Sequence, residues 1–253
     1  MKKLIIILIV LSFVGVCLAA SIQDMHRAVI ARRNAGGTPA PTYLLHEDFE
    51  SGSETFSSCG DSDNVYAWVQ IQSGNEVNCN YSTAPAPLEG AESLYADGYR
   101  GYASFTPSDN KIYVTWKQNV IVSDAANHVF EIRDPDGLLL VCVSMEDGTT
   151  RPRVNYDDVG DGGCSGNSGL DTQVFTVGTT YHFKLEYDNG TGSQDGTVAL
   201  YWSPDPFTSW THLSGRDISD ASDLQAGRIS VYGNDNATVL FDDIRVDDEN
   251  ITY

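Results

Sequence analysis

Short runs of alternating apolar and polar residues, separated by turn-forming residues, recur from Tyr43 to the end of the chain. In "KIYVTWKQNVIV", Ile112, Val114 and Trp116 fall on one face of an extended strand, because successive side chains point to opposite faces. The segment "TYHFKLEYD" alternates in the same way, and "DPDG" and "NGTGSQDG" are typical turn and hairpin-loop sequences. No convincing helical periodicity follows residue 40. The pattern predicts an all-β fold, an antiparallel β-sandwich.

The first 20 residues have a different character from the rest of the chain. Lys2 and Lys3 precede an uncharged apolar run, and the small residues of "CLAAS" follow it. A charged start, an apolar middle and a small-residue cleavage site predict a secretory signal peptide at residues 1–20. The alternative is an uncleaved anchor, for which the apolar run is short. The signal peptide is then the only expected membrane contact, and the mature protein is expected to be extracellular.

Residues 21–42 are predicted to form a basic amphipathic leader followed by a linker. In 21–34, apolar residues recur at helical spacing beside three arginines, and "AGGTPAPT" then ends the helix. This short helical extension is either a solvated leader or a docking segment. In the second case, residues 21–41 would bind an acidic neighbour, such as another copy of the protein.

The net charge limits the partners of the chain. Its 253 residues include 35 Asp and Glu against 15 Lys and Arg, which gives a formal net charge of −20. We therefore expect no nucleic-acid partner, because the phosphates of DNA or RNA would repel the protein. Many of the carboxylates serve solubility alone, but they also offer ligands for hard cations such as calcium.

Four cysteines follow the predicted cleavage site. An even number of cysteines in an exported chain favours disulfides. Pairing of neighbours in the sequence would close short loops, although four cysteines allow three pairings. The residue in "LLLVCVSM" could instead be a buried thiol of the core. The expected neighbour pairs are Cys59–Cys79 and Cys142–Cys164.

The last predicted strand, "VLFDDIRV", contains two adjacent aspartates between apolar residues. Strict alternation places Asp242 on the apolar face with Leu240, Ile244 and Val246, and places Asp243 on the other face. A carboxylate on the apolar side needs a cation or hydrogen-bond donors to offset its desolvation. Calcium would satisfy several acids at once, while Arg245 or backbone N–H groups are the alternative.

Three segments in order, "LLHEDFESG", "LEGAESLYADG" and "VLFDDIRV", resemble the concanavalin A-like jelly rolls. That superfamily includes laminin-G-like domains, carbohydrate-binding modules and family-16-type glycoside hydrolases, and the resemblance spans residues 43–253. It implies a jelly-roll sandwich with the first and last strands side by side. It also implies a structural calcium near that seam, for which the candidate ligands are Glu50, Asp242, Asp243 and a backbone carbonyl near Gly90.

The motifs for catalysis are weak. The acidic Glu-x-Asp-x-x-Glu or Glu-x-Asp-x-Glu string of family-16-type hydrolases is missing from the sequence. His128, Arg133 and Tyr156 could be combined into a lyase constellation only without support from a local motif. We therefore expect the family-16-type scaffold without its catalytic motif.

Binding is the function that the residues favour, because flat aromatic rings stack on the apolar faces of sugar rings. Trp116 alternates with aliphatic residues and is expected in the core, whereas Trp202 is either a core plug or a binding residue. The primary expectation is a non-catalytic protein that binds a carbohydrate or a cell surface. The alternatives are a subunit of an extracellular filament or coat and a divergent polysaccharide hydrolase or lyase. The candidate ligand-binding residues are Tyr99, Arg100, Tyr102, Trp202 and Trp210.

Overall fold

A computed structural model describes part of the chain. The described residues are 43–49, 69–72, 76–78, 88, 93–97, 100–107, 109–123, 127–145, 150–156, 166–170, 173–191, 195–213, 218–221, 224–232 and 237–251. The chain divides into two units, Met1–Thr42 and Tyr43–Tyr253, and every described residue belongs to the second unit. The expected signal peptide, leader and N-terminal helix lie outside the described residues.

The described residues form two antiparallel sheets and include no helix. Sheet A has nine strands, in the order β13-β12-β11-β6-β16-β4-β3, with β1 paired to β16 and β14 paired to β12. Sheet B has seven, in the order β10-β9-β8-β7-β15-β5-β2. The strands are β1 Leu45–Glu47, β2 Val69–Gln72, β3 Glu76–Asn78, β4 Leu94–Asp97, β5 Arg100–Ser104, β6 Lys111–Ser123, β7 Asn127–Arg133, β8 Leu139–Met145, β9 Pro152–Tyr156, β10 Gly166–Leu170, β11 Thr180–Asp188, β12 Gly196–Pro204, β13 Thr211–His212, β14 Ile218–Ala221, β15 Arg228–Tyr232 and β16 Ala237–Asp247.

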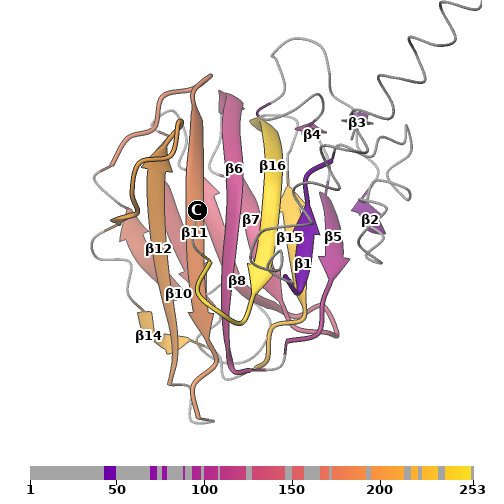
Figure 1. Cartoon of the computed structure of the whole chain (residues 1–253), viewed down its shortest axis with the longest axis vertical. Helices are drawn as coiled ribbons and strands as arrows, with labels where there is room; N and C mark the ends of the chain where they lie inside the picture. The colour runs from indigo at the N-terminus through magenta and orange to yellow at the C-terminus, as the bar shows by residue number, and fades with distance from the viewer. Residues whose placement is uncertain are drawn as a thin grey trace, which may run out of the picture. The chain divides into compact units, whose positions relative to one another are not determined.

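The two sheets lie face to face, with β12, β11, β6 and β16 in front of β10, β8, β7 and β15 in Figure 1. Trp116 of β6 is fully buried and stacks on Phe130 of β7, with ring centroids 4.1 Å apart and an interplanar angle of 7°. Phe183 of β11 stacks on Trp116 at 5.4 Å. Contacts between rings from both sheets show that the apolar faces meet in one core, so the predicted antiparallel β-sandwich is confirmed.

The turn signals in the sequence join strands as expected. The side chain of Asp134 accepts hydrogen bonds from the backbone N–H groups of Gly137 and Leu138, both at 2.6 Å, between β7 and β8. Gly137 has φ = 100°, a conformation that residues with a Cβ rarely adopt. Strands β11 and β12 pair in continuous register from Tyr181↔Pro204 to Asp188↔Thr197, as the long hairpin predicts.

The first and last strands lie side by side, as the resemblance implies. Strand β1 pairs antiparallel with β16, with His46 opposite Arg245 and Glu47 opposite Ile244. This pairing brings the start of the domain to its end. We refer to it below as the β1–β16 seam.

The predicted faces of the last strand are correct after the Asp242–Asp243 pair, where Ile244 and Val246 face the core. They are wrong before it, where Phe241 faces the core in place of Leu240 and Asp242. Strand β16 has a register shift against β6 between Asp242 and Arg245, and Asp243 there has φ = 46°. The bulge adds one residue and reverses the alternation that follows it. As a result, the apolar core contains Val239, Phe241, Ile244 and Val246, whereas Leu240 and Asp242 are buried outside that core.

Candidate functional site

The face of sheet A that points away from the core is unusually polar for a buried surface. Trp116, Phe183 and Trp202 are cross-strand partners on the core side, so their neighbours Lys117, His182 and Ser203 lie on the opposite side. Lys117, His182 and Lys184 are all less than 9% exposed. We call this surface the polar face of sheet A; it comprises Thr115, Lys117, Asn119, His182, Lys184, Glu186, Tyr201, Ser203, Asp242, Asp243 and Arg245.

Lys184 is held in place by an acid and two aromatic rings. Its ammonium donates to Glu186 Oε1 at 2.8 Å, and Lys111 contacts the other carboxylate oxygen at 3.2 Å. The Lys184 Nζ also lies 4.3 Å from the centroid of the Tyr201 ring and 5.7 Å from that of Trp210. Burial raises the pKa of Glu186, but the two lysines outweigh this effect and hold its pKa below the ordinary value. Glu186 therefore remains ionised and fixes Lys184 beneath the rings.

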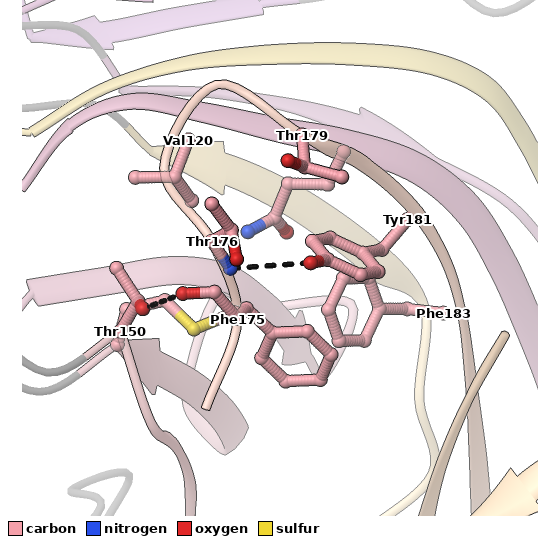
Figure 2. A pocket seen from close by; sticks show the side chains of 9 residues that line it. Val120, Thr150, Phe175, Thr176, Thr179, Tyr181 and Phe183 are labelled. Carbon is pink, nitrogen blue, oxygen red and sulfur yellow. Dashed lines mark hydrogen bonds between the residues drawn. The ribbon is translucent and has the colours of Figure 1, made fainter. Parts of the chain in front are cut away.

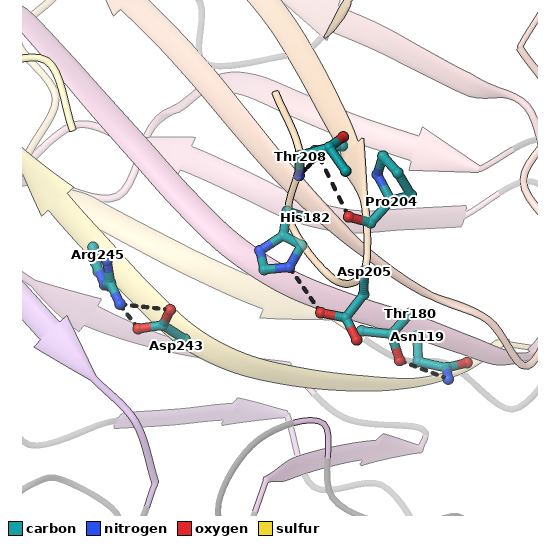
Figure 3. Close-up of polar contacts among 9 residues, drawn as sticks. Asn119, Thr180, His182, Pro204, Asp205, Thr208, Asp243 and Arg245 are labelled. Atoms are coloured by element: carbon teal, nitrogen blue, oxygen red, sulfur yellow. Dashed lines mark hydrogen bonds and ion pairs between the residues drawn. The ribbon is translucent and has the colours of Figure 1, made fainter. Parts of the chain in front are cut away.

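The loop of residues 204–210 folds back over the edge of this face, and Figure 3 shows Asp205 turned toward His182. His182 Nε2 lies 2.9 Å from Asp205 Oδ1. The backbone N–H of Thr208 donates to Ser203 Oγ at 3.1 Å. Phe207 packs edge-on against His182 at 5.6 Å and against Trp210 at 5.0 Å. These contacts place two aromatic side chains of one loop beside the polar face.

Aromatic rings at this edge are accessible to solvent. Tyr201, Phe207 and Trp210 are half-buried, and His212 is exposed and tilted against Tyr201 at 5.0 Å. We call these four residues the aromatic patch. The rings lie beside hydrogen-bonding groups that point away from the core, an arrangement suited to stacking and hydrogen bonding with a flat polar ligand.

The structure separates the other ligand-binding candidates from Trp210. Trp202 packs against the core, with its ring edge-on to Phe175 at 5.2 Å and to Tyr181 at 5.9 Å. Tyr102 lies on β5 of sheet B, where the Arg228 guanidinium stacks over its ring at 4.7 Å.

Two further candidates remain untested by the described side chains. Tyr99 lies outside the described residues, and Arg100 is described only as the first backbone position of β5. Trp210 is therefore the single predicted ligand-binding residue on the polar face of sheet A within the described part of the chain.

The two aspartates of β16 have different environments. Asp242 is 1% exposed; its carboxylate accepts from Ser93 Oγ at 2.7 Å and from the backbone N–H of Asp243 at 2.8 Å. Asp243 binds Arg245 through two hydrogen bonds of 2.8 and 2.7 Å and also contacts His46 of β1 at 3.2 Å. The negative charge of Asp243 is therefore paired with Arg245. This pairing is one of the alternatives to a metal ion that the sequence suggests.

Burial raises the pKa of Asp243, but His46 and Arg245 outweigh it and hold this pKa below the ordinary value. The other candidate metal ligands, Glu50 and Gly90, lie outside the described residues. No group of three or more His, Cys, Asp or Glu side chains that could hold a metal occurs within the described ranges.

A small pocket opens at one end of the sandwich, with about 220 Å³ of empty space that includes space open to solvent. Phe175, Tyr181 and Phe183 line it (Figure 2), together with Gln118, which is 1% exposed and has no hydrogen-bond partner for Nε2. Ligand pockets usually have about 300–1,000 Å³. This pocket is smaller than that, so the aromatic patch at the edge of sheet A is the stronger candidate for a ligand-binding surface.

Two other features bear on the sequence expectations. Cys142 is buried in β8, and Cys59, Cys79 and Cys164 lie outside the described residues, so the disulfide pairing stays a prediction. In the part of the chain that the structure describes, no helix is long and apolar enough to cross a membrane.

The two facing antiparallel sheets define the chain as a β-sandwich of the jelly-roll-like class. Among solved structures it is similar to "Cellulose induced protein, Cip1", with 14% identity, a TM-score of 0.51, and coverage of 83% of this chain and 99% of the other. It is also similar to the binding domain of botulinum neurotoxin serotype C1, with 6% identity, a TM-score of 0.51, and coverage of 83% of this chain and 49% of that one. The chain thus spans about half the length of the toxin domain.

These similarities concern the fold alone. A comparison with protein-family models finds no match. No curated protein matches the chain either.

Proposed function

We propose that the chain is a non-catalytic carbohydrate-binding protein that holds sugar rings against the aromatic patch of sheet A. The observation that carries the proposal is the half-buried Trp210, fixed beside Phe207 and over Lys184 at the edge of a polar sheet face. Trp210 and Tyr201 supply flat apolar surfaces for the faces of pyranose rings. Lys184 and Glu186 are nearby donors and acceptors for sugar hydroxyls.

We propose that the protein binds carbohydrate after secretion, because residues 1–20 have the sequence pattern of a signal peptide. The name of one fold neighbour links that protein to cellulose, which makes cello-oligosaccharides a reasonable first probe.

A glycan array that includes cellohexaose tests the proposal. We expect the full secreted chain, and a form lacking residues 21–41, to bind at least one class of oligosaccharide with the same preference. Absence of binding to every glycan would contradict the proposal. Loss of binding only in the truncated form would assign the activity to the leader instead.

We also propose that a structural calcium ion binds near the β1–β16 seam, with Asp242, Glu50 and a carbonyl near Gly90 as ligands. The burial of Asp242 supports this proposal: its carboxylate accepts from Ser93 Oγ and from the N–H of Asp243, and a calcium ion would further offset the cost of burying its negative charge. Calcium accepts such mixed oxygen ligands with tolerant geometry.

Removal of calcium should lower the stability of the wild-type protein. We expect EDTA to lower the Tm by roughly 5 °C, which corresponds to about 2 kcal/mol of ligand stabilisation in a chain of this size. In Asp242→Asn the Tm should start lower and should no longer respond to EDTA. Asp136→Asn, an exposed aspartate between β7 and β8, is the matched control and should respond as the wild type does. A wild-type Tm that EDTA and added calcium both leave unchanged would refute the metal.

A further inference from the structure

We propose that His182 and Asp205 are positioning residues whose hydrogen bond holds the loop of residues 204–210 against sheet A. In this closed position the loop presents Phe207 and Trp210 to the ligand. Acidification opens the loop and moves these two rings away from the sheet. This inference rests on the proposed binding of glycans at the aromatic patch. It adds a specific pH response that the patch alone does not imply.

The loop is anchored to the sheet at both of its ends. At the start, the His182 ring on β11 bonds to Asp205 at 2.9 Å, and Thr208 N–H donates to Ser203 Oγ at 3.1 Å. After the loop, the N–H of Leu213 donates to the carbonyl oxygen of Leu200 at 3.0 Å. Among these contacts, the one between His182 and Asp205 involves a side chain that titrates near neutral pH.

His182 contacts both the acid and an aromatic ring of the same loop. Its ring is 2% exposed and lies edge-on to Phe207 at 5.6 Å, and Phe207 lies edge-on to Trp210 at 5.0 Å. A displacement of Asp205 would therefore also remove the support of Phe207 and, through it, that of Trp210. These contacts connect His182, which can titrate, to the Trp210 ring that is proposed to stack on the ligand.

Several elements place charged groups near His182, whereas its partner on β12 is the uncharged Ser203. Lys117 lies opposite His182 on β6, Asp243 lies on β16, and Asp205 belongs to the loop, while Lys184 on its own strand is paired with Glu186. Burial lowers the pKa of His182, and Lys117 adds to this effect. Asp205 and Asp243 act in the opposite direction but do not outweigh it. His182 is thus neutral at pH 7, and its Nε2–H donates to the Asp205 carboxylate.

The sign of the pH response follows from this lowered pKa. A histidine released into water has a pKa of about 6.5. Because the pKa is lower in the closed loop than in the open loop, protons bind better to the open form. Acidification below about pH 6.5 therefore shifts the population toward the open loop. The affinity for glycans should fall over the same range.

The first experiment compares the pH profile of cellohexaose binding, or of the strongest array glycan, in two histidine variants. We expect wild-type affinity to fall severalfold between pH 8 and pH 5. His182→Gln should flatten this profile, because glutamine can donate to Asp205 but does not titrate. His46→Gln, which removes another histidine of sheet A, should keep the wild-type profile. A wild-type profile in His182→Gln would overturn the proposal.

A pair of variants at the acid separates positioning from simple loss of structure. Asp205→Asn keeps an oxygen acceptor and should retain most of the affinity at pH 8. Asp205→Ala should weaken binding at pH 8 roughly tenfold, the value expected for one lost hydrogen bond to a charged group. Equal affinity of Asp205→Ala and the wild type would contradict a positioning role.

A measurement without glycan distinguishes failure of this inference from failure of the proposed function. The fluorescence of the wild-type protein should change between pH 8 and pH 5, and the change should be lost in Trp210→Phe and in His182→Gln. If no glycan binds at any pH but the fluorescence change depends on His182 and Trp210 as described, the proposed function fails and the pH-dependent opening of the loop is supported. If His182→Gln keeps the fluorescence change, His182 does not control the loop, and this inference is wrong even if glycans bind.

Discussion

Trp116→Ala is expected to destabilise the protein more than any other tryptophan substitution in the described residues. Its ring is fully buried and stacks on both Phe130 and Phe183, so truncation leaves a cavity between the two sheets. Removal of a large buried aromatic side chain costs about 3–5 kcal/mol. In a domain of this size that loss corresponds to a decrease in Tm of roughly 10 °C.

Trp210→Ala is the matched control for this prediction. Its ring is half-buried on the outer side of sheet A and is not part of the core cluster. We expect its free energy of unfolding in urea to stay within about 1 kcal/mol of the wild-type value. A Trp116→Ala protein as stable as Trp210→Ala would contradict the proposed core.

Substitution of Asp243 is expected to have the second-largest effect. The side chain of Asp243 is 5% exposed and joins Arg245 of β16 to His46 of β1. Asp243→Asn should cost about 2 kcal/mol, which is less than for a fully buried ion pair because both partners are partly exposed. Asp243→Ala should cost about 1 kcal/mol more, since alanine tolerates the observed φ of 46° less well than asparagine.

The pH dependence of this difference provides a further test of the ion pair. The pKa of Asp243 is lower in the folded protein than its ordinary value of about 3.9, so its stabilising effect is present above that value. It is lost as the pH falls through the folded pKa. Urea unfolding should show a clear difference between the wild type and Asp243→Asn at pH 5, with a smaller difference below pH 4. A difference that is unchanged at pH 3 would exclude ionised Asp243 as its source.

Much of the fold could be predicted from the sequence because strand alternation and turn residues act locally. The alternation around Trp116 identified a core position that the structure confirms, and the Asp134–Gly137 turn joins the two strands expected on either side of it. The bulge at Asp243 was not predictable by the same rule. One extra residue reverses which side chains face the core, and nothing in "VLFDDIRV" distinguishes a bulge from regular alternation.

The candidate site was only partly predictable for a related reason. The alternation of "TYHFKLEYD" assigns Phe183 to the core face, and the same pattern places His182 and Lys184 together on the other face. The aromatic residues alone do not reveal this polar face. Trp202 and Trp210 are close in sequence but have different environments, because the first lies within β12 and the second lies in the loop that folds back. Such a return path depends on tertiary contacts like that between His182 and Asp205.

Isothermal titration calorimetry of one oligosaccharide against three proteins tests the central claim most directly. With the strongest array glycan, Trp210→Ala should weaken binding at least about tenfold relative to the wild type, since it removes a stacking ring. Tyr102→Ala, on the outer side of sheet B, should bind as the wild type does. Unchanged affinity in Trp210→Ala, or loss of binding in Tyr102→Ala alone, would contradict the assignment of the binding surface to sheet A.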